Sequence, residues 1–181
     1  DAGAAVLDAD DVNLVDVVHR VVESTRPLGE RRHVPVLVRA PDHPCLAEAD
    51  VRRVERIVRN LVTNAIDHAE SGQVVITVAG DDHAAAVTVR DYGIGLAPGE
   101  SAMVFNRFWR SDPARARTSG GTGLGLSIAL EDTHLHGGWL QAWGRPGRGA
   151  QFRLTLPRRA GSTLRRSPLS LVPEDAQETV R

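Results

Sequence analysis

The sequence contains no lysine, a single cysteine and few aromatic residues, and each shortage excludes a class of function. All 22 basic residues are arginine, which excludes chemistry that needs a lysine amine, such as a Schiff base or the lysine of a P-loop. The only cysteine, Cys45, cannot form an intramolecular disulfide, and a cysteine-based zinc site is implausible. We interpret Cys45 as structural, because it follows a turn without an obvious base partner.

Long apolar runs and an excess of one charge are also missing. The uncharged stretch Thr118–Leu130 is short and glycine-rich, well below the roughly 18–20 apolar residues of a membrane span. The first three residues lack the basic region of a signal peptide. With 22 basic and 23 acidic residues, binding to nucleic acid through bulk charge is not expected. These features predict a soluble cytoplasmic domain without a nucleic-acid partner.

The chain is long enough for one domain, and its apolar pattern predicts three helices. With 181 residues, of which 41% are hydrophobic, it can bury a core without disulfides. Apolar residues recur at helical spacing over residues 12–28, 51–69 and 124–136. Pro27 and Gly29 should end the first helix, Asp50 is a good N-cap for the second, and Gly137 should stop the third.

Short alternating or β-branched segments predict strands between these helices. They cover residues 34–38, 74–78, 84–90, 139–143 and 151–156, with a further short strand expected after the turn at residues 41–44. The order predicts an α+β two-layer sandwich, a mixed β-sheet with helices on one face, over residues 1–157. Residues 96–122 carry no clear helix or strand, and loops of this length are usually functional; we expect a flexible lid at about 97–121. Residues 158–181 are expected to form a disordered tail.

Polar side chains line one stripe of the second predicted helix. Asn60, Asn64 and Asp67 follow i, i+4, i+7 spacing, with His68 at the edge of the stripe. Asparagine is unfavourable inside helices, so two of them one turn apart suggest a function. An amide oxygen can bind Mg²⁺ while the amide NH₂ donates to a phosphate. The alternative is a solvated polar face beside neighbouring arginines.

Two glycine-rich segments suggest nucleotide binding. Asp91, Gly93 and Gly95 directly follow a predicted strand; a carboxylate there can accept a hydrogen bond from the amine of adenine, whereas guanine presents an oxygen. The alternative is a simple turn. Residues 119–127 contain four glycines that lead into a helix, a pattern typical of an anion site at a helix N-terminus. It is neither a P-loop nor a dinucleotide fingerprint, and a flexible hinge is the alternative.

Three of the few aromatic residues lie within the long loop. Phe105, Phe108 and Trp109 could anchor a lid on the core, and Arg110 could approach a terminal phosphate. The alternative is a small hydrophobic cluster under a loop. His134 and His136 point to different sides of a helix, so we do not expect a zinc site.

The four motifs together, in this order, resemble the catalytic and ATP-binding domain of bacterial sensor histidine kinases. Segments 60–65, 91–96, 105–110 and 121–126 match the asparagine box, first glycine box, phenylalanine box and second glycine box of that family. The resemblance covers about residues 12–157 and implies a Bergerat ATP-binding fold, shared with gyrase, mismatch-repair and heat-shock chaperone ATPases. The arginine-rich, lysine-free composition and the Ser167–Leu169 segment resemble the actinobacterial osmosensing or envelope-stress type.

The resemblance also implies the cofactors, ATP and Mg²⁺, and a role for each matching residue. Two residues would be catalytic: Asn64, which would hold Mg²⁺, and Arg110, which would reach the γ-phosphate. Asn60 would assist at the phosphates. Asp91 would take the adenine amine. The remaining residues implied to bind the cofactor are Asp67, His68, Gly93, Gly95, Leu96, Phe105, Gly121, Thr122, Gly123, Leu124 and Gly125. Asp67 departs from the family, which often has a basic residue there, and its charge would repel a triphosphate unless it turns away or helps hold Mg²⁺ through water.

The implied function is transfer of the γ-phosphate of Mg·ATP to a histidine of a separate dimerisation and phosphoacceptor domain. No histidine of this chain has the sequence context of a phosphoacceptor, so we expect no autophosphorylation of this chain alone. The implied partners are that domain and, through the full kinase, a response regulator; we expect a monomer and a membrane-bound parent. Alternatives are an anti-sigma-factor-type serine kinase, a chaperone-type ATPase, or a nucleotide-binding module with little catalysis. Glu55 lies off the asparagine stripe, which disfavours hydrolysis.

Overall fold

The computed structural model describes residues 6–70, 72–107, 109 and 123–177. Its helices are α1 (Leu14–Arg32), α2 (Val51–His68) and α4 (Gly125–Leu135), with short 3₁₀ turns η1 (Glu100–Ala102) and η2 (Glu174–Ala176). Its strands are β1 (Asp10–Asn13), β2 (Val36–Arg39), β3 (Leu46–Ala49), β4 (Val74–Gly80), β5 (Ala84–Asp91), β6 (Trp139–Gly144) and β7 (Ala150–Pro157).

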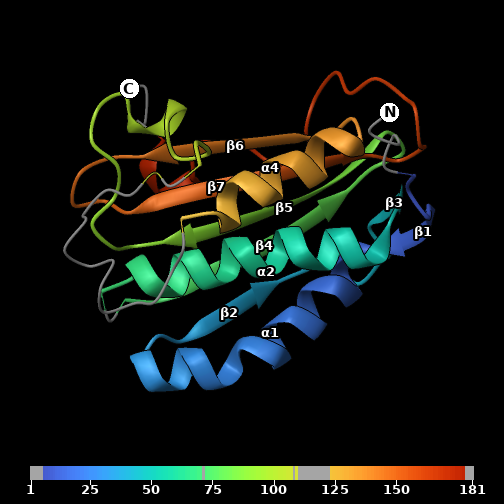
Figure 1. The fold of residues 1–181 in the computed structure, drawn as a ribbon. Helices are drawn as coiled ribbons and strands as arrows, with labels where there is room; N and C mark the ends of the chain where they lie inside the picture. Colours follow the sequence, from blue (N-terminus) through green and yellow to red (C-terminus); the bar gives the residue numbers. More distant parts are fainter. Residues whose placement is uncertain (1–5, 71, 108, 110–122, 178–181) are drawn as a thin grey trace.

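Five of these strands form one mixed sheet. Their order is β2-β4-β5-β7-β6; β2 pairs with β4 in parallel, and the other neighbours are antiparallel. Helices α1, α2 and α4 lie together on one face of this sheet (Figure 1). The expected two-layer sandwich with a mixed sheet is therefore confirmed. Strands β1 and β3 form a second, two-stranded sheet. Strand β1 was not expected, because it covers only four residues at the edge of the predicted first helix.

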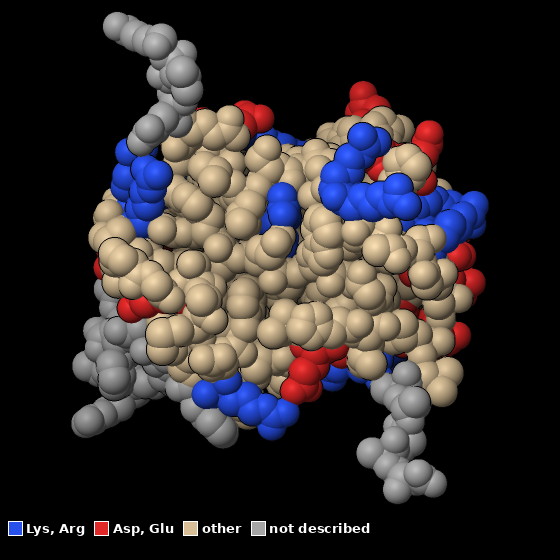
Figure 2. Space-filling model, turned by 90° about the horizontal axis from the view of Figure 1, so that it is seen from above, with Lys and Arg blue, Asp and Glu red and all other residues tan. Residues whose placement is uncertain are grey.

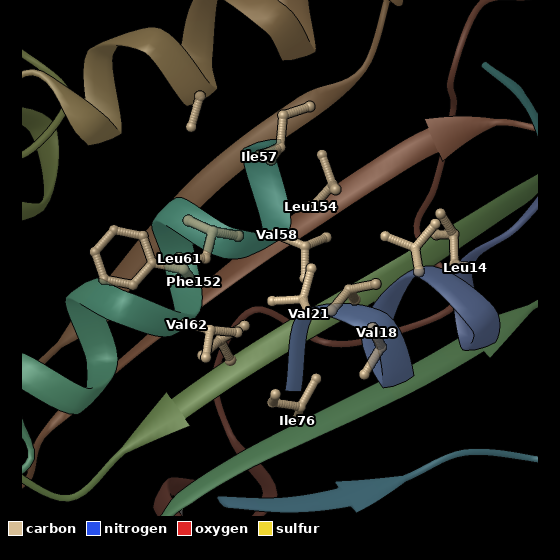
Figure 3. Packing of buried hydrophobic residues seen from close by; sticks show 14 of the residues in the cluster. Leu14, Val18, Val21, Ile57, Val58, Leu61, Val62, Ile76, Phe152 and Leu154 are labelled. Atoms are coloured by element: carbon tan, nitrogen blue, oxygen red, sulfur yellow. The ribbon is translucent and has the colours of Figure 1, made fainter. Parts of the chain in front are cut away.

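The main core lies between the helices and the sheet. Leu14, Val18 and Val21 of α1 are fully buried, as is Val58 of α2, and Val21 lies beside Val58 in front of the strands (Figure 3). From the sheet, β4 and β7 contribute Ile76, Phe152 and Leu154. Full burial of side chains of this size contributes about 1.5–3 kcal/mol each, so this shared layer fixes α2 relative to the strands on which the candidate site depends.

Helix α1 continues past the residues that were expected to end it. Pro27 lies inside the helix, which runs to Arg32 and ends at His33 in the left-handed conformation. Gly29 is buried, and a Cβ there would lie 3.0 Å from the carbonyl oxygen of Val34. The glycine thus allows the chain to fold back onto the helix, and the buried stripe of α1 outweighs the helix-breaking tendency of Pro27.

The second face of the sheet is covered by the C-terminal segment, defined here as residues 158–177. Leu164 and Ala176 are buried, and the Arg153 and Gln151 side chains donate hydrogen bonds to backbone oxygens of residues 169–171. The structure therefore differs from the expected disordered tail: residues 158–177 pack on β5 and β7, and residues 178–181 lie outside the described part. The segment is held mainly through its backbone, which a Pro- and Ser-containing sequence does not reveal.

On the side of the molecule that carries β6 in Figure 1, charged side chains lie mostly near the margin. Seen from above, the middle of that side is largely uncharged apart from some arginine (Figure 2). Within the described residues, no helix combines the length and apolar character needed to span a bilayer.

Candidate functional site

Helix α2 forms the centre of the candidate site. Asp50 caps its N-terminus by accepting a hydrogen bond from the backbone N–H of Arg53, as the sequence predicted. The apolar side of α2 is fully buried, whereas Asn60, Asn64, Asp67 and His68 are only partly buried. The helix thus holds a polar stripe at a fixed place beside the core.

Asn60 joins this stripe to the start of α4. Its Nδ2 donates a hydrogen bond to the backbone oxygen of Gly125 over 2.9 Å. A Cβ at Gly125 would lie 3.3 Å from Oδ1 of Asn60, so a larger residue would crowd the contact. The structure therefore brings the first asparagine and the end of the second glycine-rich segment together, although they are 65 residues apart in the sequence.

The N-terminus of α4 has no side-chain cap. Leu124 occupies the N-cap position without a capping hydrogen bond, and Gly123 precedes it with a positive φ of 72°. Backbone N–H groups in the first turn of a helix have no partner within the helix, and the helix dipole favours negative charge there. The end of α4 beside Asn60 therefore has the features of an anion site.

Asp91 lies at the end of β5, almost completely buried, with a relative exposure of 1%. One carboxylate oxygen, Oδ1, accepts a hydrogen bond from the N–H of Gly93 over 3.0 Å. The other, Oδ2, is buried without a hydrogen-bond partner among the described residues. Burial raises the pKa of Asp91, although the Gly93 hydrogen bond, the charges of His68 and Arg90 and the backbone N–H of Ala150 act in the opposite direction. A buried acceptor without a donor is costly in a folded protein, and a ligand amine would satisfy it.

The glycines after Asp91 are required by the protein backbone itself. A Cβ at Gly93 would lie only 1.6 Å from the carbonyl oxygen of His68. Gly95 has a φ of 76°, and a Cβ there would lie 1.8 Å from the carbonyl oxygen of Arg145. Leu96 follows and is buried. The glycines therefore let this loop lie close to the end of α2 and to the β6–β7 turn.

His68 completes this end of the site. Its Nδ1 donates to the backbone oxygen of Asn64 over 2.8 Å, which fixes the ring against its own helix. The Asn64 side chain has no hydrogen-bond partner among the described residues. The polar stripe thus presents one engaged amide, at Asn60, and one amide available to a ligand, at Asn64.

Asp67 and Glu55 of α2 are both paired with arginines of α1. The Asp67 carboxylate lies 3.4 Å from a guanidinium nitrogen of Arg32. Burial raises the pKa of Asp67, and Arg32 and His68 partly offset this effect. Glu55 accepts a hydrogen bond from Arg20 over 2.6 Å. Both carboxylates are thus paired with arginines of α1.

The first part of the long loop is anchored to the core. The rings of Phe105 and Phe152 meet edge to face at 5.9 Å, Val104 is buried, and Trp109 packs partly buried against the core. Arg107 forms an exposed ion pair with Glu131 of α4. Phe108, Arg110, Gly121 and Thr122 were also predicted to belong to the lid or the site, and they lie outside the described residues.

Sequence reasoning missed a buried ion-pair cluster between α2 and α4. The Asp132 side chain is 2% exposed and accepts hydrogen bonds from Arg53 and Arg56 over 2.7–2.9 Å. Burial acts to raise the pKa of Asp132, but the two arginines outweigh it and lower the pKa. His136 donates through Nδ1 to the Asp132 backbone and accepts from the Asp50 N–H. The available signal was Arg53 and Arg56 one helical turn apart.

Within the described residues, no group of three or more His, Cys, Asp or Glu side chains could hold a metal ion. Cys45 is buried and burial raises the pKa of its thiol, which agrees with a structural role.

Comparison with known proteins agrees with this geometry. Residues 49–160 match the family model described as histidine kinase-, DNA gyrase B- and HSP90-like ATPase. The sensor histidine kinase MtrB of Mycobacterium tuberculosis is 54% identical over 96% of this chain, which spans 30% of MtrB. Among solved structures, full-length ShkA in complex with AMPPNP is 27% identical with a TM-score of 0.75, over 90% of this chain and 34% of ShkA.

A second solved structure is the mycobacterial sensor histidine kinase MprB, at 28% identity and a TM-score of 0.69, which covers 84% of this chain and 99% of the MprB chain. The overall likeness to these structures agrees with the mixed sheet and helix layer of this chain. We conclude that the chain belongs to the family of histidine kinase-, DNA gyrase B- and HSP90-like ATPases.

Proposed function

We propose that this chain binds Mg·ATP and donates the γ-phosphate to a histidine on a separate dimerisation and phosphoacceptor domain. The observation that carries the proposal is the buried Oδ2 of Asp91, which has no donor among the described residues. An adenine amine placed there would supply the missing donor. The solved structure of ShkA, a complex with AMPPNP, supports an adenine nucleotide as the ligand of this fold.

The site has two ends of different chemistry. Asp91 and His68 form the end suited to the base, whereas Asn60 and the uncapped start of α4 form the end suited to phosphates. Eight residues separate Asn60 from His68, which corresponds to about 12 Å along a helix. We infer that the nucleotide lies along the polar stripe of α2, with its base at the C-terminal end of the helix.

The residues present fit a magnesium ion shared with the nucleotide. Mg²⁺ is commonly held by one or two protein oxygens together with phosphates and water, and the amide of Asn64 is available for this role. When bound, the ion would neutralise phosphate charge. Asn60 would help position the phosphates. Asp67, which was expected at the cofactor site, would help to hold the ion through water or keep its charge turned toward Arg32 and away from the phosphates.

The roles of the lid and the second glycine-rich segment belong to the same proposal. Arg110 would reach the γ-phosphate, and Gly121, Thr122, Gly123, Leu124 and Gly125 would line the triphosphate. Leu96, Gly93 and Gly95 would shape the floor of the base pocket, and Phe105 would anchor the lid through Phe152. Catalysis would then consist mainly of positioning and charge neutralisation.

The partners of the whole protein are inferred from its relatives. The chain spans 30% of the length of MtrB of M. tuberculosis, so a phosphoacceptor domain, a response regulator and a membrane-bound sensor in the parent are proposals. We infer that the chain itself is monomeric and acts on the cytoplasmic side.

The direct test uses ATP labelled at the γ-phosphate. The chain alone should bind ATP without acquiring label, and label should appear on the dimerisation domain of the same kinase when the two are mixed. The product should be acid-labile, as a phosphohistidine is. Label on a histidine of this chain alone would refute the proposal, and an acid-stable product would favour a serine kinase.

A further inference from the structure

The C-terminal segment contacts the sheet directly behind the proposed adenine site. Asp91 faces the helices, and its neighbour Arg90 faces the opposite side of β5, where the segment lies. The guanidinium of Arg90 forms an ion pair of 3.0 Å with Asp175 of η2. The Arg90 side chain is 5% exposed and that of Asp175 is 46% exposed, so the segment reaches the buried cation from the solvent side.

Arg90 also donates hydrogen bonds to backbone carbonyls of its own strand end and of the β6–β7 turn. Its Nη1 donates to the carbonyl oxygens of Asp91, at 2.7 Å, and of Arg148, at 2.8 Å. The guanidinium carbon lies 4.3 Å from the ring centroid of Tyr92 and 5.1 Å from that of Trp143. A single guanidinium thus ties the end of β5 to the β6–β7 turn and lies over the rings of Tyr92, which follows β5, and of Trp143 in β6.

The β6–β7 turn is in turn interlocked with the loop after Asp91. The N–H of Gly147 donates to the carbonyl oxygen of Ile94 over 2.9 Å. A Cβ at Gly149 would lie 2.0 Å from the carbonyl oxygen of Asp91. Since the turn and the loop touch through their backbones, a shift of the turn would move the carboxylate of Asp91 and the Gly93 N–H that orients it.

We propose that Arg90 is a positioning residue for adenine recognition and that the C-terminal segment, through Asp175, holds it in place. The inference rests on the proposed function, because it assumes that Asp91 receives the adenine amine. It assigns a role in nucleotide binding to Asp175, which lies beyond the matched family region that ends at residue 160. Arg90 and Asp175 touch no nucleotide; they act by fixing the orientation of Asp91.

The test replaces Asp175 by asparagine, which removes the charge and keeps the shape. The matched control is Glu174→Gln, one residue earlier, an exposed side chain without an ion pair in the described structure. We expect Asp175→Asn to weaken Mg·ATP binding by about two- to tenfold, within the range of coupling between contacting groups. Binding of tripolyphosphate, which has no base, should be unchanged, and Asp175→Glu should restore part of the affinity. Glu174→Gln should bind both ligands as the wild type does.

A second readout needs no nucleotide. Amide hydrogen exchange at Gly93, whose N–H is bonded to Asp91, should be faster in Asp175→Asn than in the wild type and unchanged in Glu174→Gln. Unchanged ATP affinity and unchanged Gly93 exchange in a folded Asp175→Asn variant would overturn the positioning role alone. Equal weakening for ATP and tripolyphosphate would do the same, because the effect would not involve the base. A wild-type protein that does not bind Mg·ATP would instead overturn the proposed function.

Discussion

Replacing Asp91 by asparagine should change which base the protein accepts. The substitution keeps the shape and an oxygen that can still accept from the Gly93 N–H, as Oδ1 does now. It places an NH₂ donor where Oδ2 stands without a partner. Adenine presents a donor at position 6 and hypoxanthine, the base of ITP, presents an oxygen there, so the variant should repel the first and accept the second.

The size of the effect follows from the burial of that oxygen. A hydrogen bond to a charged group contributes about 1.5–3 kcal/mol, and Oδ2 is buried away from water that could replace it. With a factor of ten for each 1.4 kcal/mol, we expect Asp91→Asn to weaken Mg·ATP binding by roughly 10- to 150-fold. Binding of Mg·ITP should become stronger than in the wild type.

The fold should tolerate the change. Burial raises the pKa of Asp91 in the folded protein, so the folded state holds its proton more tightly than the unfolded chain. Stability from this group is therefore complete below the unfolded pKa of about 3.9 and is lost as the pH rises through the folded pKa. At pH 7 the variant, which carries no charge there, should be at least as stable as the wild type without nucleotide.

Isothermal titration calorimetry with both nucleotides, together with thermal unfolding, measures these effects. The control is Asp82→Asn, an exposed carboxylate in the β4–β5 turn. Wild-type affinity for ATP in Asp91→Asn would refute the role of Oδ2. Equal loss of ATP and ITP binding would show that Asp91 does not read position 6 of the base.

Further predictions concern the phosphate end of the site and its support. Asn64→Ala should reduce Mg·ATP binding below detection in calorimetry and leave the melting temperature within a few degrees of the wild type. The neighbouring control, Thr63→Ala, should bind Mg·ATP normally. Wild-type affinity in Asn64→Ala would refute the role of Asn64 as the magnesium ligand. Asp132→Asn should lower the free energy of unfolding by about 2 kcal/mol at pH 7, because Arg53 and Arg56 lose their buried partner. Since these arginines lower the pKa of Asp132, its stabilisation is present above about pH 3.9 and is lost as the pH falls through the folded pKa. Between pH 7 and pH 3, the free energy of unfolding in urea should therefore fall less for the variant than for the wild type. An equal fall in both proteins would contradict the stabilising role of the Asp132 ion pairs.

Helix α2 shows what the sequence could predict well. Its N-cap Asp50 and its single apolar side are local features, and both appear in the structure as expected. The β4–β5 hairpin is also local, since its strands flank a short polar turn. Elements of this kind depend on neighbours in the sequence, so pattern and capping were enough.

Features that depend on distant contacts were not predictable. Helix α1 continues past Pro27 because packing on α2 and the sheet outweighs local preference. Residues 158–177 pack because side chains of β7 bind their backbone oxygens, a contact without a sequence signature. The composition of that segment alone favoured disorder.

In the candidate site, too, local features were predictable from the sequence and distant contacts were not. The residue types at Asn60, Asn64 and Asp91 could be selected from the sequence, because their spacing and neighbours are unusual. The partners of these residues could not: Gly125 lies 65 positions from Asn60. Gly93 and Gly95 were expected to admit a ligand, and the structure shows that backbone carbonyls of His68 and Arg145 already require them to be glycine.

The most direct test of the account is a crystal structure of this chain with Mg²⁺ and a non-hydrolysable ATP analogue. We expect the adenine amine within hydrogen-bond distance of Oδ2 of Asp91, the metal on the side-chain oxygen of Asn64, and the phosphates at the start of α4. A nucleotide bound elsewhere, or one whose base leaves Oδ2 of Asp91 without a partner, would contradict it.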